Sequence, residues 1–201
     1  MIRGAFNVEI GYLDYRKDPG TYVYAKVLDG LTEARLALEM LGRGLVQNAS
    51  ARAFMSVRSI VSALIVKNFA KIIEGVDERR RAWYEDVGYS APTTGLIGIS
   101  KDLKKLGIDV EAVVKTALLL HRFSYNGFDL NLVDYRDLDE VKDDITEVVN
   151  WVLTIKELFL DVWDERLERE VGELRRLLGR YRLNEYLRLN YFSEIFIGLD
   201  Y

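Results

Sequence analysis

The side chains best suited to chemistry stand close together near the middle of the chain, between residues 118 and 128. The only histidine of the sequence, His121, is followed directly by Arg122 and, three residues later, by Tyr125. An imidazole can move a proton near neutral pH, and a guanidinium can hold a phosphate or a carboxylate through two parallel hydrogen bonds. Arg122, His121 and Tyr125 are therefore the candidate ligand-binding residues of this sequence.

Each of these side chains also has a structural interpretation. His121 falls on the apolar side of a predicted helix over residues 110–123, where a histidine commonly packs in the core and hydrogen-bonds to the backbone or to a tyrosine. Arg122 can pair with the acidic segment at residues 137–147. We expect these structural uses to prevail, and we predict no catalytic residue.

Composition limits the other kinds of chemistry. The chain has no cysteine, which excludes disulfides, thiol nucleophiles and cysteine-based zinc sites. Glu140, Asp143 and Glu147 share one face of a predicted helix and could hold magnesium or calcium, but carboxylates near the start of a helix are also explained by its dipole. Residues 95–99 contain two glycines without the lysine or the spacing of a phosphate loop. We therefore predict no metal and no cofactor.

The elements that must position these residues are helices. Apolar residues three or four apart predict core helices at residues 22–47, 50–74, 109–123 and 137–163, antiparallel in sequence order, with Asn48 or Ser50 as the cap of the second. A short charged surface helix at residues 77–84 and a further element at 96–106 separate the second core helix from the third. The fold class is all-α, an up-down four-helix bundle with a helical C-terminal extension.

The C-terminal part of the chain continues the apolar stripe beyond this bundle. It runs through residues 167–181, so the last helix must either break or project from the bundle. Residues 10–15 resemble residues 197–201, and the two ends can pair as short strands or the C-terminus can form a helical clasp through Tyr186, Leu187, Tyr191 and Ile195. The apolar surface of residues 186–201 and of the preceding stripe exceeds what one bundle can cover, which predicts a homodimer.

The chain reads as one domain with extensions: residues 1–21 as an N-terminal extension, 22–163 as the bundle and 164–201 as the C-terminal arm and tail.

The N-terminus lacks a signal-peptide pattern, and the most apolar run, residues 60–66, is too short to span a bilayer, which predicts a cytoplasmic protein. A net charge of -4 with interspersed signs offers no broad basic face, so any RNA contact would be local. Many Glu, Lys and Arg residues beside one glutamine are typical of thermophiles.

Three features of the sequence resemble the HEPN superfamily and, within it, the archaeal PaREP group. They are the helix order, the Thr93-Thr94 turn before a leucine-rich helix, and residues 117–125, which lead into the last long helix. The resemblance covers about residues 22–160. It implies an up-down four-helix bundle and frequent homodimers. It also implies one of two roles: metal-independent RNA cleavage, or action together with a nucleotidyltransferase partner.

The cleaving members of that superfamily resemble one another in an arginine followed after four to six residues by a histidine. Arg122 stands in place, but Gly127 and Phe128 occupy the positions of the histidine. Metal-free attack by a ribose 2′-hydroxyl needs a group that moves a proton near neutral pH, and phenylalanine cannot do so. We therefore expect a noncatalytic module acting through protein contacts, as a homodimer and beside a nucleotidyltransferase or toxin-antitoxin partner. The alternative is a metal-independent RNA-processing enzyme or a nucleotide-binding domain using Arg122 and His121.

Overall fold

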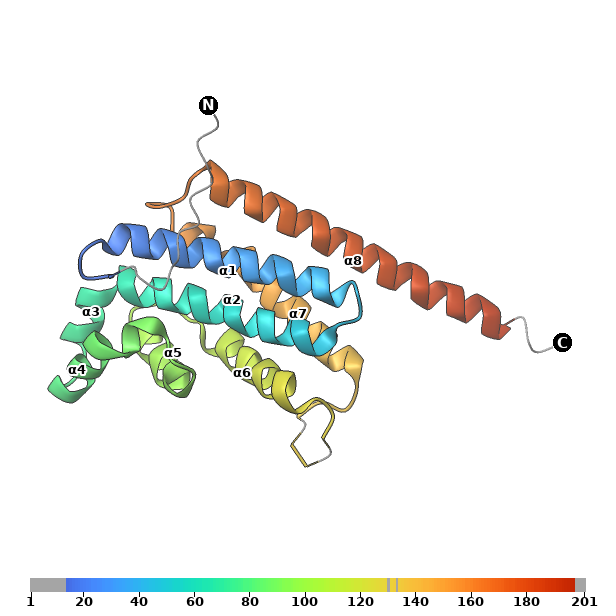
Figure 1. The fold of residues 1–201 in the computed structure, drawn as a ribbon, viewed down its shortest axis with the longest axis horizontal. Helices are drawn as coiled ribbons and strands as arrows, with labels where there is room; N and C mark the ends of the chain where they lie inside the picture. The colour runs from blue at the N-terminus through green and yellow to red at the C-terminus, as the bar shows by residue number, and fades with distance from the viewer. Residues whose placement is uncertain (1–13, 130, 133, 198–201) are drawn as a thin grey trace.

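The computed structural model describes residues 14–129, 131–132 and 134–197, with side chains described as far as Leu187, and every regular element in this part of the chain is a helix (Figure 1). The predicted all-α class is therefore confirmed for the described residues. The predicted pairing of the termini rests on residues 1–13 and 198–201, which lie outside them. The helices are α1 (Pro19–Leu41), α2 (Val46–Lys67), α3 (Phe69–Glu74), α4 (Glu78–Asp86), α5 (Leu96–Lys105), α6 (Glu111–Asn126), α7 (Leu138–Val152) and α8 (Glu165–Ile197).

The first two helices begin and end where local chemistry requires it. The Asp18 carboxylate accepts a hydrogen bond from the Thr21 backbone N–H at 2.9 Å, and Pro19 fits the first turn of α1. Gly44 has a φ of +76°, so the chain turns there and α1 ends at Leu41, before the predicted end at residue 47. The predicted cap at Asn48 or Ser50 is wrong, because α2 begins at Val46 and both residues lie inside it, where the Ser50 hydroxyl donates to the Val46 carbonyl.

Helix α2 is the centre of the core and touches α1, α6 and α7. Its buried side chains are mostly apolar, but Ser50, Ser56, Ser59 and Ser62 are buried with them. The predicted second helix divides at Asn68 into α2 and α3, because the Asn68 side chain donates to the Leu64 carbonyl as α2 ends. Among the described helices, α2 alone is long and apolar enough to cross a membrane, and most of that stretch is buried within the protein, as in the core helix of any compact domain.

The predicted helix over residues 137–163 is shorter in the structure. Helix α7 begins at Leu138, capped by the Asp137 carboxylate, and ends at Val152. A 3-10 turn, Ile155–Leu158, follows, and Ile155 and Phe159 are still buried, so the apolar seam continues although the helix does not. The break reverses the chain and places α8 along α1.

Helix α8 has a packed half and a projecting half. Its N-terminus is capped by Asp164, whose carboxylate accepts from the Leu167 backbone N–H at 2.9 Å. Leu167, Val171, Leu174 and Leu178 are buried against the core. Figure 1 shows the last turns of α8 extending past the ends of the other helices, so that the backbone through Ile197 projects and does not clasp the bundle.

Candidate functional site

The three predicted binding residues all lie near the C-terminal end of α6, but they do not form one pocket. The His121 imidazole stacks on the Phe54 ring of α2, with centroids 4.0 Å apart and planes inclined by 23°. Tyr125 meets the imidazole edge-on at 5.0 Å, and its own side chain is 77% exposed. Arg122 points elsewhere and bonds through Nη1 to Asp134 Oδ1 at 2.8 Å. Neighbouring helical residues point about 100° apart, which explains this divergence.

His121 is a half-buried packing residue. Burial lowers the pKa of its imidazole, and the nearby positive charge of Arg58 lowers it further. The predicted hydrogen bond to backbone or tyrosine is not found for this side chain among the described residues; the aromatic stack with Phe54 takes its place. The imidazole is therefore held neutral by its surroundings at neutral pH.

The acidic helix does not serve as the partner of Arg122. That partner, Asp134, belongs to the loop before α7, and the prediction of an ion pair within residues 137–147 is wrong by a few residues. Arg136, which lies just before α7, bonds to Glu140 of that helix and thereby lowers the pKa of the Glu140 carboxyl. The Tyr135 hydroxyl donates to Asp144 at 2.6 Å, and burial, followed by this carboxylate, raises the pKa of the phenol.

No group of three or more His, Cys, Asp or Glu side chains in the described part of the chain is arranged to hold a metal ion, and this includes the face of Glu140, Asp143 and Glu147. Glu140 is bound by Arg136, so the carboxylates of this face are partly taken up by the protein itself.

The resemblance to HEPN proteins led us to look for a histidine at residues 127 and 128, and the residues found there have structural roles of their own. Gly127 ends α6 with a φ of +56°, and a Cβ there would lie 2.9 Å from Gln47 Nε2 at the start of α2. A histidine at this position would be strained by its backbone conformation and crowded by Gln47. Phe128 packs edge-on against Phe123, with ring centroids 5.1 Å apart.

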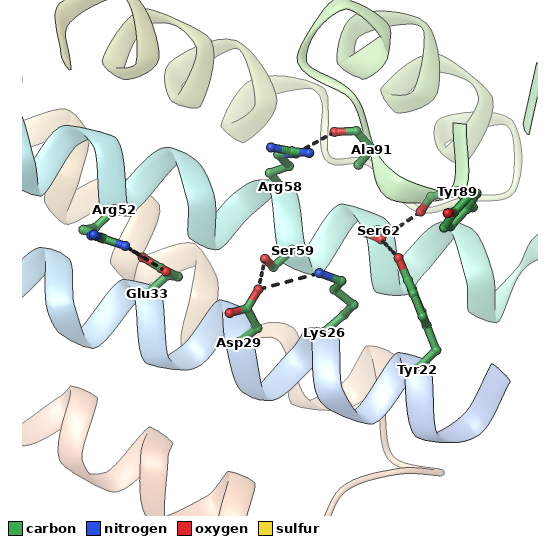
Figure 2. Close-up of polar contacts among 10 residues, drawn as sticks. All are labelled: Tyr22, Lys26, Asp29, Glu33, Arg52, Arg58, Ser59, Ser62, Tyr89 and Ala91. Carbon is green, nitrogen blue, oxygen red and sulfur yellow. Dashed lines mark hydrogen bonds and ion pairs between the residues drawn. The ribbon is translucent and has the colours of Figure 1, made fainter. Parts of the chain in front are cut away.

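A second polar cluster, between α1 and α2, was not predicted from the sequence. Figure 2 shows it as a row of contacts between the two helices, which run side by side. The Tyr22 hydroxyl lies 2.9 Å from Ser62 Oγ, which in turn donates to the Tyr89 carbonyl at 2.8 Å. Ser59 Oγ donates to the Asp29 carboxylate, and Lys26 Nζ lies 3.9 Å from the same carboxylate oxygen. We call this row the α1–α2 seam.

The seam carries ionised groups that are partly removed from water. Arg52 Nη1 bonds to both carboxylate oxygens of Glu33, at 3.1 and 3.2 Å. Burial raises the pKa of Glu33, and Arg52 partly offsets this effect. Burial is also the main cause that lowers the pKa of Lys26; Arg58 adds to it, and Asp29 opposes it.

Arg58 joins the seam to the loop between α4 and α5. Its Nε donates to the Ala91 carbonyl at 3.1 Å, and Figure 2 shows the side chain reaching from α2 toward that loop. Ala91 has a φ of 52° and is the one non-glycine residue with positive φ in the described chain. An L residue in this conformation is strained by about 1 kcal/mol, so the bond from Arg58 helps to hold the loop in place.

A sequence signal for the seam did exist. Ser56, Ser59 and Ser62 recur every third residue within an otherwise apolar helix, and Lys26, Asp29 and Glu33 recur three and four residues apart in the preceding one. Both spacings place the polar side chains on one face of a helix. The spacings do not show that these two polar faces pack against each other.

Comparison with known proteins identifies the chain. The model of the archaeal PaREP1/PaREP8 family matches residues 25–146, more than half of its length. The chain belongs to the archaeal PaREP1/PaREP8 family. The match in this PaREP chain begins in α1 and ends in α7, so it includes the α1–α2 seam, His121 and Arg122. No curated protein and no solved structure matches the chain.

Proposed function

We propose that this PaREP protein is a noncatalytic helical module of the HEPN type, which acts in the cytoplasm through protein contacts and as a homodimer. In this proposal α1, α2, α6 and α7 form the up-down four-helix bundle of that superfamily. The contacts of α2 with α1, α6 and α7, and of α7 with α1 and α6, support this arrangement.

The divergence of Arg122 and His121 supports the noncatalytic part of the proposal. A metal-free ribonuclease site needs a proton-transferring group and a phosphate clamp that converge on one ribose and its phosphate. Here the imidazole packs on Phe54, while the guanidinium bonds to Asp134 on another side of α6. Gly127, at the position of the HEPN histidine, cannot supply the missing group.

The distribution of exposed apolar side chains supports the proposal that the module acts through protein contacts. Ten large apolar residues of the described chain are exposed, and eight of them gather at one end of the molecule. We call this set the apolar end: Leu45, Tyr125, Phe128, Leu132, Leu138, Leu183, Tyr186 and Leu187. Single exposed apolar residues are ordinary in monomers, but a contiguous group of this size marks an interaction surface.

Three observations bring the elements that carry these residues to one end of the molecule. Gly127, next to Phe128, packs on Gln47 beside the α1–α2 turn. Residues of α8 between Leu177 and Glu185 line a hollow with residues 42–44 of that turn and with Val46. The same part of α8, with Tyr186, lines another hollow with residues 139–146 of α7. Figure 1 shows the turn, the start of α7 and the projecting part of α8 at the same end.

In this proposal a second copy of the chain covers the apolar end, and the shape of α8 supports that choice. A helix of 33 residues is about 50 Å long, and its last turns pass beyond the helices on which its first half packs. The sequence of these turns includes Tyr191, Phe192, Ile195, Phe196 and Ile197. A two-fold dimer brings the apolar arm of each copy onto the apolar end of the other, so one surface serves both partners.

The test is a charge substitution at the apolar end, read as molar mass by light scattering. We expect the double variant Leu183→Glu, Leu187→Glu to be monomeric at concentrations where the unmodified chain is dimeric. Leu160→Glu is the matched control, because Leu160 and Leu187 are both 56% exposed but Leu160 lies outside the apolar end. A dimer that survives the double variant, or dissociates equally in the control, would refute this surface.

The noncatalytic claim has its own test. Purified protein incubated with single-stranded RNA in the presence of a chelator should leave the RNA intact. Cleavage that is lost in Arg122→Ala or His121→Ala variants that keep their helical circular dichroism would instead establish an RNA-processing enzyme.

The resemblance to HEPN proteins extends the proposal to a second partner, a nucleotidyltransferase or a toxin-antitoxin protein encoded by a neighbouring gene. Co-expression of the chain with the product of the adjacent gene, followed by co-purification, tests this extension. We expect the pair to elute together. Independent elution would remove this partner and leave the homodimer as the whole assembly.

A further inference from the structure

A surface hollow of about 390 Å³ lies between α4 and α5. Two contacts fix these segments against each other. The Tyr84 hydroxyl donates to Asp102 Oδ2 at 3.1 Å, and a Cβ added at Gly95 would lie 2.6 Å from Trp83 Cη2. Figure 1 shows α4 and α5 at the other end of the molecule from the projecting turns of α8. The volume lies within the roughly 300 to 1,000 Å³ that is typical of small-molecule sites.

Positive charge predominates in this hollow. It is lined by Arg80 of α4 and by Lys101 and Lys105 of α5. Asp102 is the one carboxylate among the described residues that line it, and this carboxylate is already engaged. One of its oxygens accepts from Tyr84, and the other accepts from Lys105 at 2.6 Å. Three positive charges therefore stand against one negative charge, although the whole chain has a net charge of -4.

Several hydrogen-bond donors of the hollow have no protein acceptor. The Lys101 ammonium has no ion-pair or hydrogen-bond partner in the described part of the chain, and the same holds for Trp83 Nε1 and the Thr94 hydroxyl. Arg80 approaches Asp77 through Nε alone, at 3.6 Å, so its two terminal nitrogens are without a partner among the described residues. Ammonium, guanidinium and indole N–H groups can only donate, so a ligand that completes these bonds must supply acceptors.

Gly98 keeps the hollow open on the side of α5. It lies inside this helix and lines the hollow, and a Cβ built there would meet nothing within 4 Å. Glycine inside a helix lowers stability relative to alanine, and no close contact requires glycine at this position. A larger side chain at residue 98 would take up part of the space that a ligand could use.

We propose that this hollow binds a phosphate group, either as free phosphate or as the monoester of a small molecule, through Arg80, Lys101 and Lys105. A phosphate monoester carries a charge of about −1.5 to −2 near neutral pH and three strong acceptor oxygens. It therefore balances the excess of two positive charges and accepts from several of the unpartnered donors, whereas a carboxylate supplies one charge and two oxygens. This site is separate from the apolar end, and it stands or falls independently of the dimer.

Isothermal titration calorimetry with inorganic phosphate, ribose 5-phosphate and AMP tests the site and distinguishes the sources of the phosphate group. The titrations are made at constant ionic strength, with sodium chloride as the reference salt. The NMR signal of the Trp83 indole N–H locates the ligand; among the three tryptophans of the chain, it is the signal lost in Trp83→Phe. We expect saturable binding that shifts this signal. The tightest of the three ligands identifies the source as free phosphate, a sugar phosphate or a nucleotide.

Lys101→Gln should weaken binding of that ligand by at least about tenfold, the effect of losing a charge-assisted hydrogen bond. This substitution breaks no ion pair or hydrogen bond of the Lys101 side chain within the described chain. Lys104→Gln is the matched control, because Lys104 lies on the same helix but pairs with Asp109 at 2.8 Å and does not line the hollow. It changes the net charge by the same amount and should leave the affinity unchanged.

Gly98→Leu tests the space without altering the charge. Leucine favours a helix and its Cβ has room, so the melting temperature should not fall, but binding should weaken by at least about tenfold. Gly98→Ala is the control and should still bind. The proposal is overturned if none of the three ligands binds more tightly than chloride, or if Lys101→Gln or Gly98→Leu binds as tightly as the unmodified chain. Equal weakening in Lys104→Gln and Lys101→Gln would also overturn it, because the effect would then follow from net charge.

Discussion

The close approach of α1 and α2 at Gly30 offers a sharp test of the core. A Cβ added at Gly30 would lie 2.5 Å from Ile60 Cγ1, 3.1 Å from Ile60 Cδ1 and 3.2 Å from the Ser56 carbonyl oxygen. Ile60 is fully buried and the Ser56 oxygen belongs to the backbone of α2, so neither can simply move aside. The Ser56 hydroxyl also donates to the Gly30 carbonyl at 2.7 Å, which ties the two helices together at this point.

These contacts give the expected size of the effect of Gly30→Ala. Alanine gains about 1 kcal/mol over glycine in helix propensity. Overpacking costs about 1 to 3 kcal/mol, and displacing the hydrogen bond from Ser56 adds about 0.5 to 1.5 kcal/mol. We therefore expect a net loss of about 0.5 to 3.5 kcal/mol in the free energy of unfolding.

Urea unfolding followed by circular dichroism measures this change, and Gly98→Ala is the control. Gly98 lies inside α5, and a Cβ there would meet nothing within 4 Å. Alanine should therefore stabilise that helix by about 0.5 to 1 kcal/mol. A Gly30→Ala variant as stable as the unmodified chain would refute the close crossing of α1 and α2.

Two further predictions concern α6. Because burial lowers the pKa of His121 below its ordinary value of 6.5, the unfolded chain takes up the proton first, and the stability contributed by this residue should fall as pH drops through 6.5. An NMR titration of the single histidine should give a pKa below 6.5, and a pKa above 6.5 would contradict the packing on Phe54. The variant His121→Phe should lose less melting temperature than the unmodified chain between pH 7.5 and pH 5.5. The variant Arg122→Ala should change the free energy of unfolding by less than about 1 kcal/mol, because the ion pair with Asp134 is solvent-exposed. A larger loss in a denaturant titration would mean that Arg122 is part of the core.

The sequence was a good guide to the helices and a poorer guide to their ends. Apolar spacing located the helices that became α1, α2, α6 and α7, because burial of one face requires that spacing wherever the helix packs. It could not locate the break after Val152, because Ile155 and Phe159 stay buried through a 3-10 turn and preserve the seven-residue pattern. An apolar pattern reports which side chains are buried, and a turn can bury them as well as a helix.

The candidate site, like the helices, could be predicted only in part from the sequence. The position of His121 on the apolar side of its helix was predictable, since it depends on periodicity within one helix. The partner of Arg122 was misplaced by a few residues, because a long side chain at the end of a helix can reach either the next helix or the loop before it. The α1–α2 seam was missed because it depends on which faces of two helices meet, and this follows from tertiary packing.

The mass of the unmodified chain in solution tests the central claim most directly. Sedimentation equilibrium at micromolar concentration should give twice the 23.2 kDa of one chain, because the proposed dimer packs the arm of each copy against the apolar end of the other. A mass of one chain, constant over a tenfold range of concentration, would contradict the account.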